Sequence, residues 1–353
     1  MTLRLPPGAR ICLVMMSAIG DAVHALPVVT ALKRHDPTID LTWILQGGPA
    51  RLIEGHPDVD EIVRFERGRG LRAFTDIRRK LAGRRFDLVL DLQVYFKASV
   101  VTALVRAPIK LGFDRARARD MNWLVTNRRI PPHPPQHVQD QYFEFLHHLG
   151  VNPLPVQWKL GPWPQEREMQ REVLSRFGRP VACLAIGSSE ASREWEPVRW
   201  ARLAERLHNE HGLQPVLIGG PSERELTVGA SIMREANVPV ESTLGSTLRE
   251  MVALIDGSAL VVALNSAPLH ISVALGRPVI GLMAHRNPKR TGPYRYRDLM
   301  VDAYGAPGEE YPVTLETRPG GLERVTVDEV VERVRLWSGR YRDDPSGQGV
   351  AHG

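Results

Sequence analysis

The sequence is poor in cysteine and in aromatic residues, and it lacks long apolar runs. Two cysteines, Cys12 and Cys183, lie far apart in 353 residues, each inside an apolar segment. Such a pair is typical of buried thiols in a reducing compartment, and it neither builds a disulfide framework nor holds a metal cluster alone. The longest apolar runs, such as Ile11–Met16 and Ala259–Leu264, have 6 residues, whereas a bilayer-spanning helix needs roughly 20. A disulfide-rich secreted protein and an integral membrane protein are both excluded.

The first residues have some features of a secretion signal, because Arg4 and Arg10 precede an apolar run. However, Pro6-Pro7-Gly8 interrupts the basic part, and Asp21 closes the run without a small-residue cleavage pattern. We therefore expect the chain to lie in the cytoplasm.

Net charge differs strongly between the two halves of the chain. Residues 1–160 carry a net charge of +8 and residues 161–353 a net charge of −2. The basic half suits an anionic partner such as a phosphorylated lipid or a membrane surface. It is equally consistent with a solvated surface in an arginine-rich protein, since only 6 of the 46 cationic residues are lysine. Few aromatic residues are interleaved with the cations, which argues against nucleic acid as the partner.

Length and periodicity predict two α/β domains. A chain of this length suggests two domains of about 100–200 residues each, and short Val-, Ile- and Leu-rich runs alternate with helical patterns, as in parallel sheets. The expected strands are Arg10–Met16, Leu41–Leu45, Phe86–Leu92, Val181–Ile186, Pro215–Gly219, Ala259–Leu264 and Pro278–Met283. The expected helices are Ala22–Arg34, Lys97–Val105, Pro197–His211, one from Ser222, Thr247–Ile255, Pro268–Leu275 and Val327–Trp337.

The alternation is interrupted at residues 151–164, which carry 4 prolines. This segment is the expected linker, so the predicted domains are residues 1–160 and 161–340, with a ligand cleft between them. We expect residues 341–353, rich in Asp, Gly, Ser and Arg, to form a disordered tail.

Three polar segments follow expected strands, where ligands bind in open α/β sheets. The first is Ser17-Ala18-Ile19-Gly20-Asp21, in which Asp21 stands at a helix start and either faces a ligand or only caps the helix. It is neither a G-x-G-x-x-G fingerprint nor a phosphate-binding loop ending in G-K-[ST].

The second segment runs from Gly187 to Trp195, and its hydroxyls Ser188 and Ser189 with Arg193 suit a phosphate. The alternative is a polar surface loop with one exposed arginine.

The third segment is Asn265-Ser266-Ala267-Pro268-Leu269-His270. Ser266 is expected to be the N-cap of a helix whose first amides suit a diphosphate, with Pro268 in the first turn. His270 is either a ligand contact or a buried core histidine.

Together these segments resemble glycosyltransferase family 9, the heptosyltransferases of lipopolysaccharide core assembly. Ser17–Pro27 is similar to the family's N-terminal motif, and Ser188–Trp195 to its donor loop, with Arg193 where lysine is usual. Gly219-Gly220-Pro221 with Glu223 is similar to its nucleoside-side loop. Its acceptor-side segments are matched by Asp91-Leu92-Gln93 with Lys97 and by Gly112–Arg115 with Arg119. The resemblance covers roughly residues 8–295.

The resemblance implies a GT-B fold, with two Rossmann-like domains, the acceptor on the first and the nucleotide-sugar on the second. It implies metal-independent, cofactor-free transfer with inversion of a heptose, from ADP-heptose, onto an anionic glycolipid acceptor at the inner membrane surface. Neither nucleic acid nor an obligate protein partner is expected. Asp21 would be the general base. The implied donor contacts are Ser188, Ser189, Arg193, Glu223, Asn265, Ser266, Ala267 and His270. The implied acceptor contacts are Gln93, Lys97, Arg115 and Arg119.

One segment departs from the family pattern. Asn265-Ser266-Ala267 stands where the family usually has Asp-[Ser/Thr]-Gly. The negative charge of the aspartate is therefore missing, and the Ala267 methyl crowds the close approach of a phosphate to the backbone. Two alternatives therefore stay open: a nucleotide-sugar epimerase of the same fold, and a non-catalytic protein that binds a nucleotide-sugar or a lipid.

Overall fold

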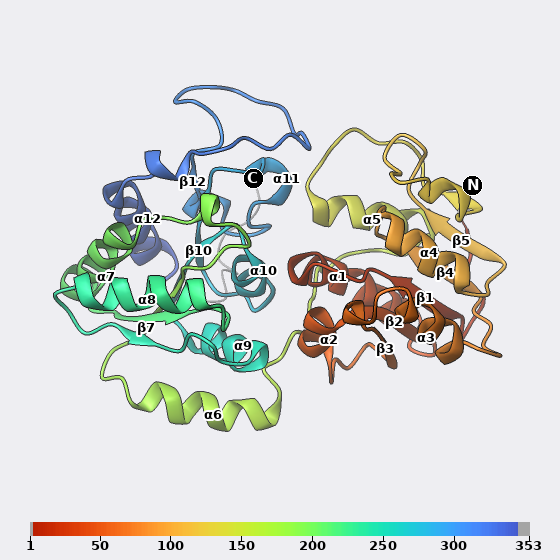
Figure 1. Ribbon diagram of the computed structural model, residues 1–353, viewed down its shortest axis with the longest axis horizontal. Coiled ribbons are helices and arrows are strands. Elements are labelled where there is room, and N and C mark those ends of the chain that lie inside the picture. Colours follow the sequence, from red (N-terminus) through yellow and green to blue (C-terminus); the bar gives the residue numbers. More distant parts are fainter. Residues whose placement is uncertain (1–2, 345–353) are drawn as a thin grey trace. The chain divides into compact units, whose positions relative to one another are not determined.

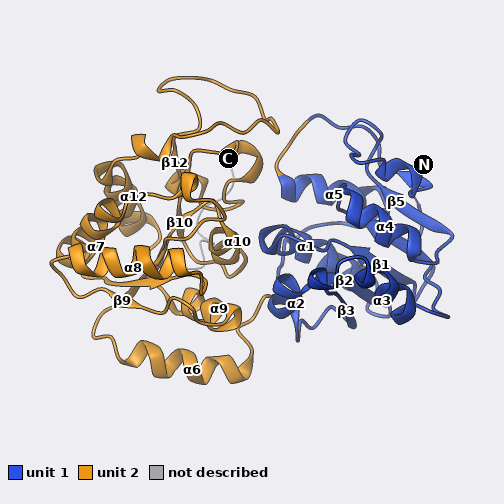
Figure 2. Ribbon diagram, viewed as in Figure 1, with its two compact units in different colours: residues 1–134, 138–159 blue, residues 135–137, 160–353 orange. Residues whose placement is uncertain are grey.

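The computed structural model describes residues 3–344, which divide into two compact units (Figure 2). Unit 1 comprises the chain up to Pro134 together with Val138–Lys159. Unit 2 comprises Pro135–His137 and the chain from Leu160 onward. The chain therefore passes finally from unit 1 to unit 2 inside the proline-rich segment 151–164.

Each unit alternates strands and helices along the chain (Figure 1). The elements of unit 1 are β1 (Arg10–Val14), α1 (Ile19–His35), β2 (Asp40–Gln46), α2 (Gly47–Ile53), β3 (Glu61–Phe65), α3 (Arg72–Lys80), β4 (Leu88–Asp91), α4 (Phe96–Leu104), β5 (Ile109–Gly112), β6 (Arg128–Arg129) and α5 (Val138–His148). Those of unit 2 are α6 (Pro164–Ser175), β7 (Val181–Ala185), α7 (Pro197–His211), β8 (Gln214–Ile218), α8 (Glu223–Glu235), β9 (Glu241–Ser242), α9 (Leu248–Gly257), β10 (Leu260–Leu264), α10 (Ala267–Ala274), β11 (Val279–Met283), α11 (Pro288–Thr291), β12 (Val301–Asp302) and α12 (Val327–Arg340).

Both sheets have six strands, and every strand pair in them is parallel. The strand order is β3-β2-β1-β4-β5-β6 in unit 1 and β12-β11-β10-β7-β8-β9 in unit 2. In each sheet the winding direction reverses beside the first strand, between β1 and β4 and between β7 and β10. These are the topological switch points at which open α/β sheets bind ligands. The predicted pair of Rossmann-like sheets is confirmed.

The central strands are buried because helices cover the sheets. In unit 1, Cys12 and Val14 of β1 pack into one apolar cluster with Ile77 of α3 and Val101 of α4. In unit 2, all residues of β7, β10 and β11 are buried. Burial on both faces explains why these strands are continuous apolar runs in the sequence rather than alternating patterns.

The proline-rich segment 151–164 is the expected linker, but its last residue already belongs to a helix. Pro164 is the first residue of α6, and the Glu166 carboxylate accepts a hydrogen bond of 2.7 Å from the Trp163 amide. Proline is favoured at this position because its fixed φ suits the helix start and its missing N–H needs no partner there. Gln170 then ties α6 to α9 through the Ala253 carbonyl, at 2.7 Å.

The ordered chain continues past residue 340. Tyr341, inside the segment expected to be a disordered tail, is buried, and its hydroxyl lies 2.9 Å from both Asp298 carboxylate oxygens. Residues 345–353 of that expected tail lie outside the described residues.

Two further expectations concern burial and membrane spans. Cys12 and Cys183 are free and buried, as the sequence predicts, and burial raises the pKa of both thiols. Among the helices of residues 3–344, none has the length and apolar character that crossing a bilayer requires.

A buried carboxylate lies at the end of β4. Asp91 is fully buried and accepts hydrogen bonds from the Thr102 hydroxyl (2.9 Å), the Asn122 side-chain amide (2.8 Å) and the Gln93 amide (3.3 Å). These donors favour the charged form, yet burial outweighs them and raises the pKa of Asp91 to about 6. The network joins β4, α4 and the segment after β5.

Ionisation of Asp91 should destabilise the folded protein. Its pKa is raised from 3.8 to about 6, so the folded state binds the extra proton between these values, and stability falls as pH rises through them. Asn at position 91 keeps the acceptor for Thr102 and Asn122 without a charge. Wild type should therefore lose on the order of 2–3 kcal/mol of unfolding free energy relative to Asp91→Asn between about pH 4 and 7.

Urea unfolding of both proteins across this pH range measures the difference. The exposed Asp120→Asn provides the control, for which the difference from wild type should not vary with pH in this way. A pH-independent difference for Asp91→Asn would contradict a raised pKa at this site.

Candidate active site

In unit 1 the switch point is bordered by the loop after β1. Asp21 is the third residue of α1, and one carboxylate oxygen accepts a 3.0 Å hydrogen bond from the Ala18 amide. The other oxygen has no hydrogen-bond partner among residues 3–344. The capping alternative therefore accounts for one oxygen, and the second stays available to a ligand.

Gln93 holds this loop in place. It is buried, and its side-chain oxygen accepts a 3.0 Å hydrogen bond from the Met16 amide while its amide nitrogen donates to the Ser17 carbonyl. Because both ends of the side chain bond to the loop backbone, the structure assigns Gln93 to positioning the loop before Asp21. The predicted contact of Gln93 with an acceptor stays a prediction.

The other three expected acceptor residues are exposed cations that follow β4 and β5. Lys97 lies in the first turn of α4, and the Arg115 guanidinium lies 5.6 Å from the ring centre of Trp123. Within the described part of the chain, Lys97 and Arg119 form no ion pair. Arg117, by contrast, is committed to Asp114 and Glu144. Since all strands are parallel, these free cations share the carboxyl edge of the sheet with Asp21.

Residues 64–85 carry nine basic side chains, and four of them are neutralised by nearby carboxylates. Arg64 pairs with Glu54 at 2.8 Å, and Arg84 pairs with Glu61. Arg69 and Arg79 both pair with Asp76, each at 2.8 Å. For these four arginines the structure supports the solvated-surface alternative.

In unit 2 the second and third motifs meet at the switch point. Ser188 and Arg193 follow β7, Asn265 follows β10, and all three line one small cavity of about 20 Å³ with His285 and Arg286, which follow β11. Partial burial and the nearby Arg193 lower the pKa of His285 below its ordinary value. The strand ends thus present hydroxyl, amide and guanidinium groups together.

Arg193 is the central cation of this group. It is partly buried, with 21% of its side chain exposed, and its guanidinium pairs with Glu190 at 2.7 Å. The Ser188 hydroxyl lies 3.4 Å from the Glu190 amide, whereas Ser189 is exposed. An arginine held at the mouth of a cavity by one carboxylate keeps donors for an anion.

The start of α10 corrects one expectation. Ser266 is the N-cap residue, but its hydroxyl lies 3.4 Å from the Leu264 carbonyl and does not cap the helix. Ala267 and Pro268 then form its first two positions. The Asn265 side chain donates to the Thr291 hydroxyl of α11 at 3.2 Å. His270 is buried within α10, in keeping with the core alternative.

A further carboxylate near these strand ends is Glu225, which the sequence patterns did not indicate. Glu223 is exposed at the start of α8, whereas the Glu225 side chain is half-buried and directed at Gly187 and Gly219, where any side chain would collide with it. Burial raises the pKa of Glu225, and the neighbouring Glu194 adds to this effect. The capping pattern that begins at Ser222 was the available signal, because it places Glu225 at the third helical position.

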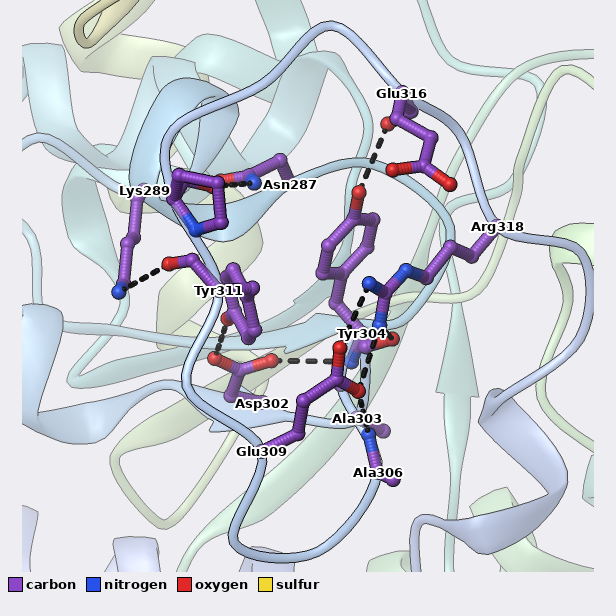
Figure 3. A network of polar contacts seen from close by, with 12 residues as sticks. Asn287, Lys289, Asp302, Ala303, Tyr304, Ala306, Glu309, Tyr311, Glu316 and Arg318 are labelled. Carbon is purple, nitrogen blue, oxygen red and sulfur yellow. Dashed lines mark hydrogen bonds and ion pairs between the residues drawn. The ribbon is translucent and has the colours of Figure 1, made fainter.

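A polar network fixes the segment next to α11 (Figure 3). Tyr311 donates to Asp302 at the end of β12, and Arg318 makes two hydrogen bonds to Glu309, at 2.8 and 2.9 Å. The Arg318 pairing lowers the pKa of Glu309 to about 2. Lys289 of α11 donates to the Tyr311 carbonyl at 2.7 Å. The network therefore supports the helix that contacts Asn265.

Residues 3–344 contain no group of three or more His, Cys, Asp or Glu side chains placed so that they could hold a metal ion.

Comparisons with known proteins agree with this arrangement. The sequence model of glycosyltransferase family 9 (heptosyltransferase) matches residues 74–310, about two thirds of the chain. The lipopolysaccharide core heptosyltransferase OpsX of Haemophilus influenzae is 28% identical over 335 residues, which cover 92% of this chain and 96% of OpsX.

Solved structures show the same fold. A family 9 glycosyl transferase from Veillonella parvula has a TM-score of 0.81 at 19% identity, over 95% of this chain and 98% of its own. The E. coli heptosyltransferase WaaC with ADP-2-deoxy-2-fluoro heptose has a TM-score of 0.72 at 20% identity, over 93% and 99% of the two chains. The expected GT-B fold is confirmed.

Removing the Gln93 amide should loosen the loop after β1. Gln93→Leu leaves the buried Met16 amide and the part-buried Ser17 carbonyl without their side-chain partner, and the buried amide alone costs about 1–3 kcal/mol of unfolding free energy. Amide hydrogen exchange at residues 15–18 should accelerate more than elsewhere in unit 1. The exposed Lys97→Ala is the control and should change neither quantity. Unchanged exchange in Gln93→Leu would show that other contacts fix the loop.

Proposed function

The chain belongs to glycosyltransferase family 9, the heptosyltransferases, and on that premise we propose that it transfers a heptose from ADP-heptose to a lipopolysaccharide core acceptor, with inversion and without a metal ion. Unit 1 binds the acceptor and unit 2 the nucleotide-sugar. The relative OpsX is named as a lipopolysaccharide core enzyme, and the similar E. coli structure carries an ADP-heptose analogue. Both support this choice of substrates.

The observation that carries the proposal is the position of Asp21. It lies beside the unit 1 switch point with one carboxylate oxygen bonded to Ala18 and the other without a protein partner among the described residues. A carboxylate in this place acts as the general base for an acceptor hydroxyl. Gln93 keeps the preceding loop in position through Met16 and Ser17.

The proposed reaction is a single displacement. The acceptor hydroxyl oxygen forms a bond to the anomeric carbon as the bond from that carbon to the diphosphate breaks. The hydroxyl proton goes to Asp21, and the bonding electrons leave with ADP. Attack from the face opposite the leaving group inverts the anomeric configuration.

On the donor side, charge on the diphosphate is balanced by the protein. Arg193 supplies a fixed cation, Ser188 a hydroxyl, and the start of α10 the Ala267 amide. Pro268 has no N–H, and the Leu269 amide donates to the Ser266 carbonyl. Asn265 keeps its carbonyl oxygen for a sugar hydroxyl while its amide holds Thr291. These groups supply the neutralisation that a metal ion gives in other transferases.

For the nucleoside we propose Glu225 instead of Glu223. Its carboxylate faces the strand-end glycines Gly187 and Gly219, whereas Glu223 is exposed. An acidic residue near the strand ends of a Rossmann-like sheet is suited to accept hydrogen bonds from ribose hydroxyls.

We further propose that the chain acts in the cytoplasm, at the inner face of the cytoplasmic membrane, where a phosphorylated lipid acceptor is exposed. The net charge of +8 in residues 1–160 and the unpaired cations after β4 and β5 support an anionic acceptor on unit 1.

Asp21→Asn tests the catalytic assignment. Asparagine keeps the shape and the oxygen that accepts from Ala18 but cannot take a proton at neutral pH. Transfer should fall at least about 100-fold, the lower range for general-base catalysis. ADP-heptose binding, measured by calorimetry, should stay near wild type, and so should the thermal unfolding midpoint.

Three outcomes would contradict the proposal. Normal transfer by a less stable Asp21→Asn protein would reduce Asp21 to a helix cap. Conversion of the nucleotide-sugar without any acceptor would identify an epimerase. Failure of the wild type to bind ADP-heptose would favour a non-catalytic protein.

A matched pair of variants tests the nucleoside contact. Glu225→Gln should weaken ADP binding about tenfold or more, because hydrogen bonds to a charged acceptor contribute about 1.5–3 kcal/mol. Glu223→Gln, two residues earlier on the same helix, should leave ADP binding unchanged. Calorimetric titration with ADP measures both, and a larger loss in Glu223→Gln would reverse the assignment.

A further inference from the structure

Four large apolar side chains are exposed near the carboxyl edge of the unit 1 sheet. They are Tyr95 (55% exposed), Phe96 (58%), Met121 (54%) and Leu124 (70%). We refer to these four residues as the apolar surface. Scattered exposed apolar residues are ordinary, but a group of them on one part of a protein marks an interaction site.

The two segments of the apolar surface are tied together by hydrogen bonds. Asp120 accepts from the Phe96 amide at 3.0 Å, which joins the segment after β5 to the first turn of α4. Asn122 is fully buried and donates to the Ser99 hydroxyl of α4 at 3.1 Å and to Asp91 at 2.8 Å. The four exposed side chains therefore lie on segments that these hydrogen bonds hold in place.

The backbone at this place is held in an unfavourable conformation. Asp120 and Met121 have φ angles of 48° and 57°, in the left-handed region that non-glycine residues seldom adopt. Such geometry persists when surrounding contacts enforce it. Here the left-handed conformation turns the chain, so that the exposed Asp120 bonds to α4 while Asn122, two residues later, is buried.

Cations border the apolar surface. Lys97 follows Phe96 directly, and Arg119 precedes Asp120 and Met121 by one and two residues. Arg115 lies over the Trp123 ring at 5.6 Å. Three exposed cations therefore accompany one exposed carboxylate, Asp120, which already bonds to the Phe96 amide. The border of the surface is complementary to a layer of negative charge.

We propose that Tyr95, Phe96, Met121 and Leu124 insert into the interfacial layer of an anionic lipid bilayer. Aromatic side chains favour this layer, and apolar neighbours gain free energy as they leave water. The bordering cations lie where lipid phosphates are found, and each contributes attraction that salt weakens. The combination of apolar area and basic charge is that of a reversible interfacial contact.

This contact deepens the proposed function and rests on it for the identity of the acceptor. The apolar surface follows β4 and β5, whose carboxyl ends lie on the same sheet edge as the loop that leads to Asp21. Binding to a bilayer by this edge turns the catalytic carboxylate toward lipids. A lipid-anchored acceptor then meets Asp21 by diffusion in the membrane plane.

Vesicle sedimentation with the full chain tests the contact. The wild type should bind vesicles of phosphatidylcholine with phosphatidylglycerol, bind pure phosphatidylcholine more weakly, and be released by added salt. Phe96→Ser/Leu124→Ser should reduce the partition coefficient at least about tenfold, since two apolar side chains no longer leave water. The matched control, Met233→Ser/Leu315→Ser, changes exposed apolar residues of unit 2 (40% and 53% exposed) and should bind like wild type.

Transfer assays separate this inference from the proposed function. With a deacylated, water-soluble acceptor, wild type and Phe96→Ser/Leu124→Ser should have equal kcat and KM. With the same acceptor embedded in vesicles, the variant should lose at least about tenfold in kcat/KM. Absence of transfer by wild type to either acceptor would refute the proposed function and leave the vesicle result to stand alone.

Several results would overturn the membrane contact itself. One is equal vesicle binding by wild type and Phe96→Ser/Leu124→Ser, provided that both unfold at the same temperature within about 2 °C. Another is an equal loss of binding in the unit 2 control. A third is a change from dimer to monomer in the variant, by light scattering without lipid, which would assign the apolar surface to self-association.

Discussion

The parallel direction of all strands in each sheet is the constraint on which the arrangement depends. It brings every strand's carboxyl end to one edge, so residues distant in sequence share one surface. In unit 1 this edge carries Asp21, Gln93 and the cations after β4 and β5. In unit 2 it carries Ser188, Arg193 and Asn265. The reversal of strand order beside β1 and β7 leaves the space for a ligand that neighbouring connections would otherwise fill.

Buried polar groups hold the carboxyl edge of the unit 1 sheet in place. Asp91 ends β4 inside the protein and anchors Thr102 and Asn122, although burial opposes its charge. Gln93, two residues later, fixes the loop before Asp21. Apolar side chains at positions 91 and 93 would hold neither the β1–α1 loop nor the segment after β5. The same network that orders the catalytic loop therefore also orders the apolar surface.

The two units divide the chemistry according to charge. Within residues 3–344, Lys97 and Arg119 of unit 1 have no ion-pair partner, while four of the nine cations in residues 64–85 are paired with carboxylates. In unit 2, Arg193 at the small cavity pairs with Glu190, and Arg224 pairs with Glu194. This difference suits the proposed transfer from a nucleotide-sugar to a phosphorylated lipid. Unpaired cations attract an anionic acceptor, and a cation such as Arg193 can exchange its protein carboxylate for a phosphate.

The sequence by itself determined the fold class, seven of the twelve described strands and the places where polar loops follow them. The apolar run of β10 and the amphipathic pattern of α7 depend on residues that are close in the sequence, so periodicity predicts both elements. Asp21, Ser188 and Asn265 were identified as candidates because each follows a predicted strand. Only the tertiary structure decided the directions of side chains. Gln93 faces the β1–α1 loop, Ser266 bonds back to Leu264, and Glu225, not Glu223, faces the strand ends. The two-residue strands β6, β9 and β12 were also missed, because two residues carry no periodicity. Strands β3 and β5 were missed because they are only partly buried and lack a continuous apolar run. The physical reason is common to all of these: a side chain's hydrogen-bond partner depends on segments that are close in space and far apart in the sequence, as Met16 and Gln93 are.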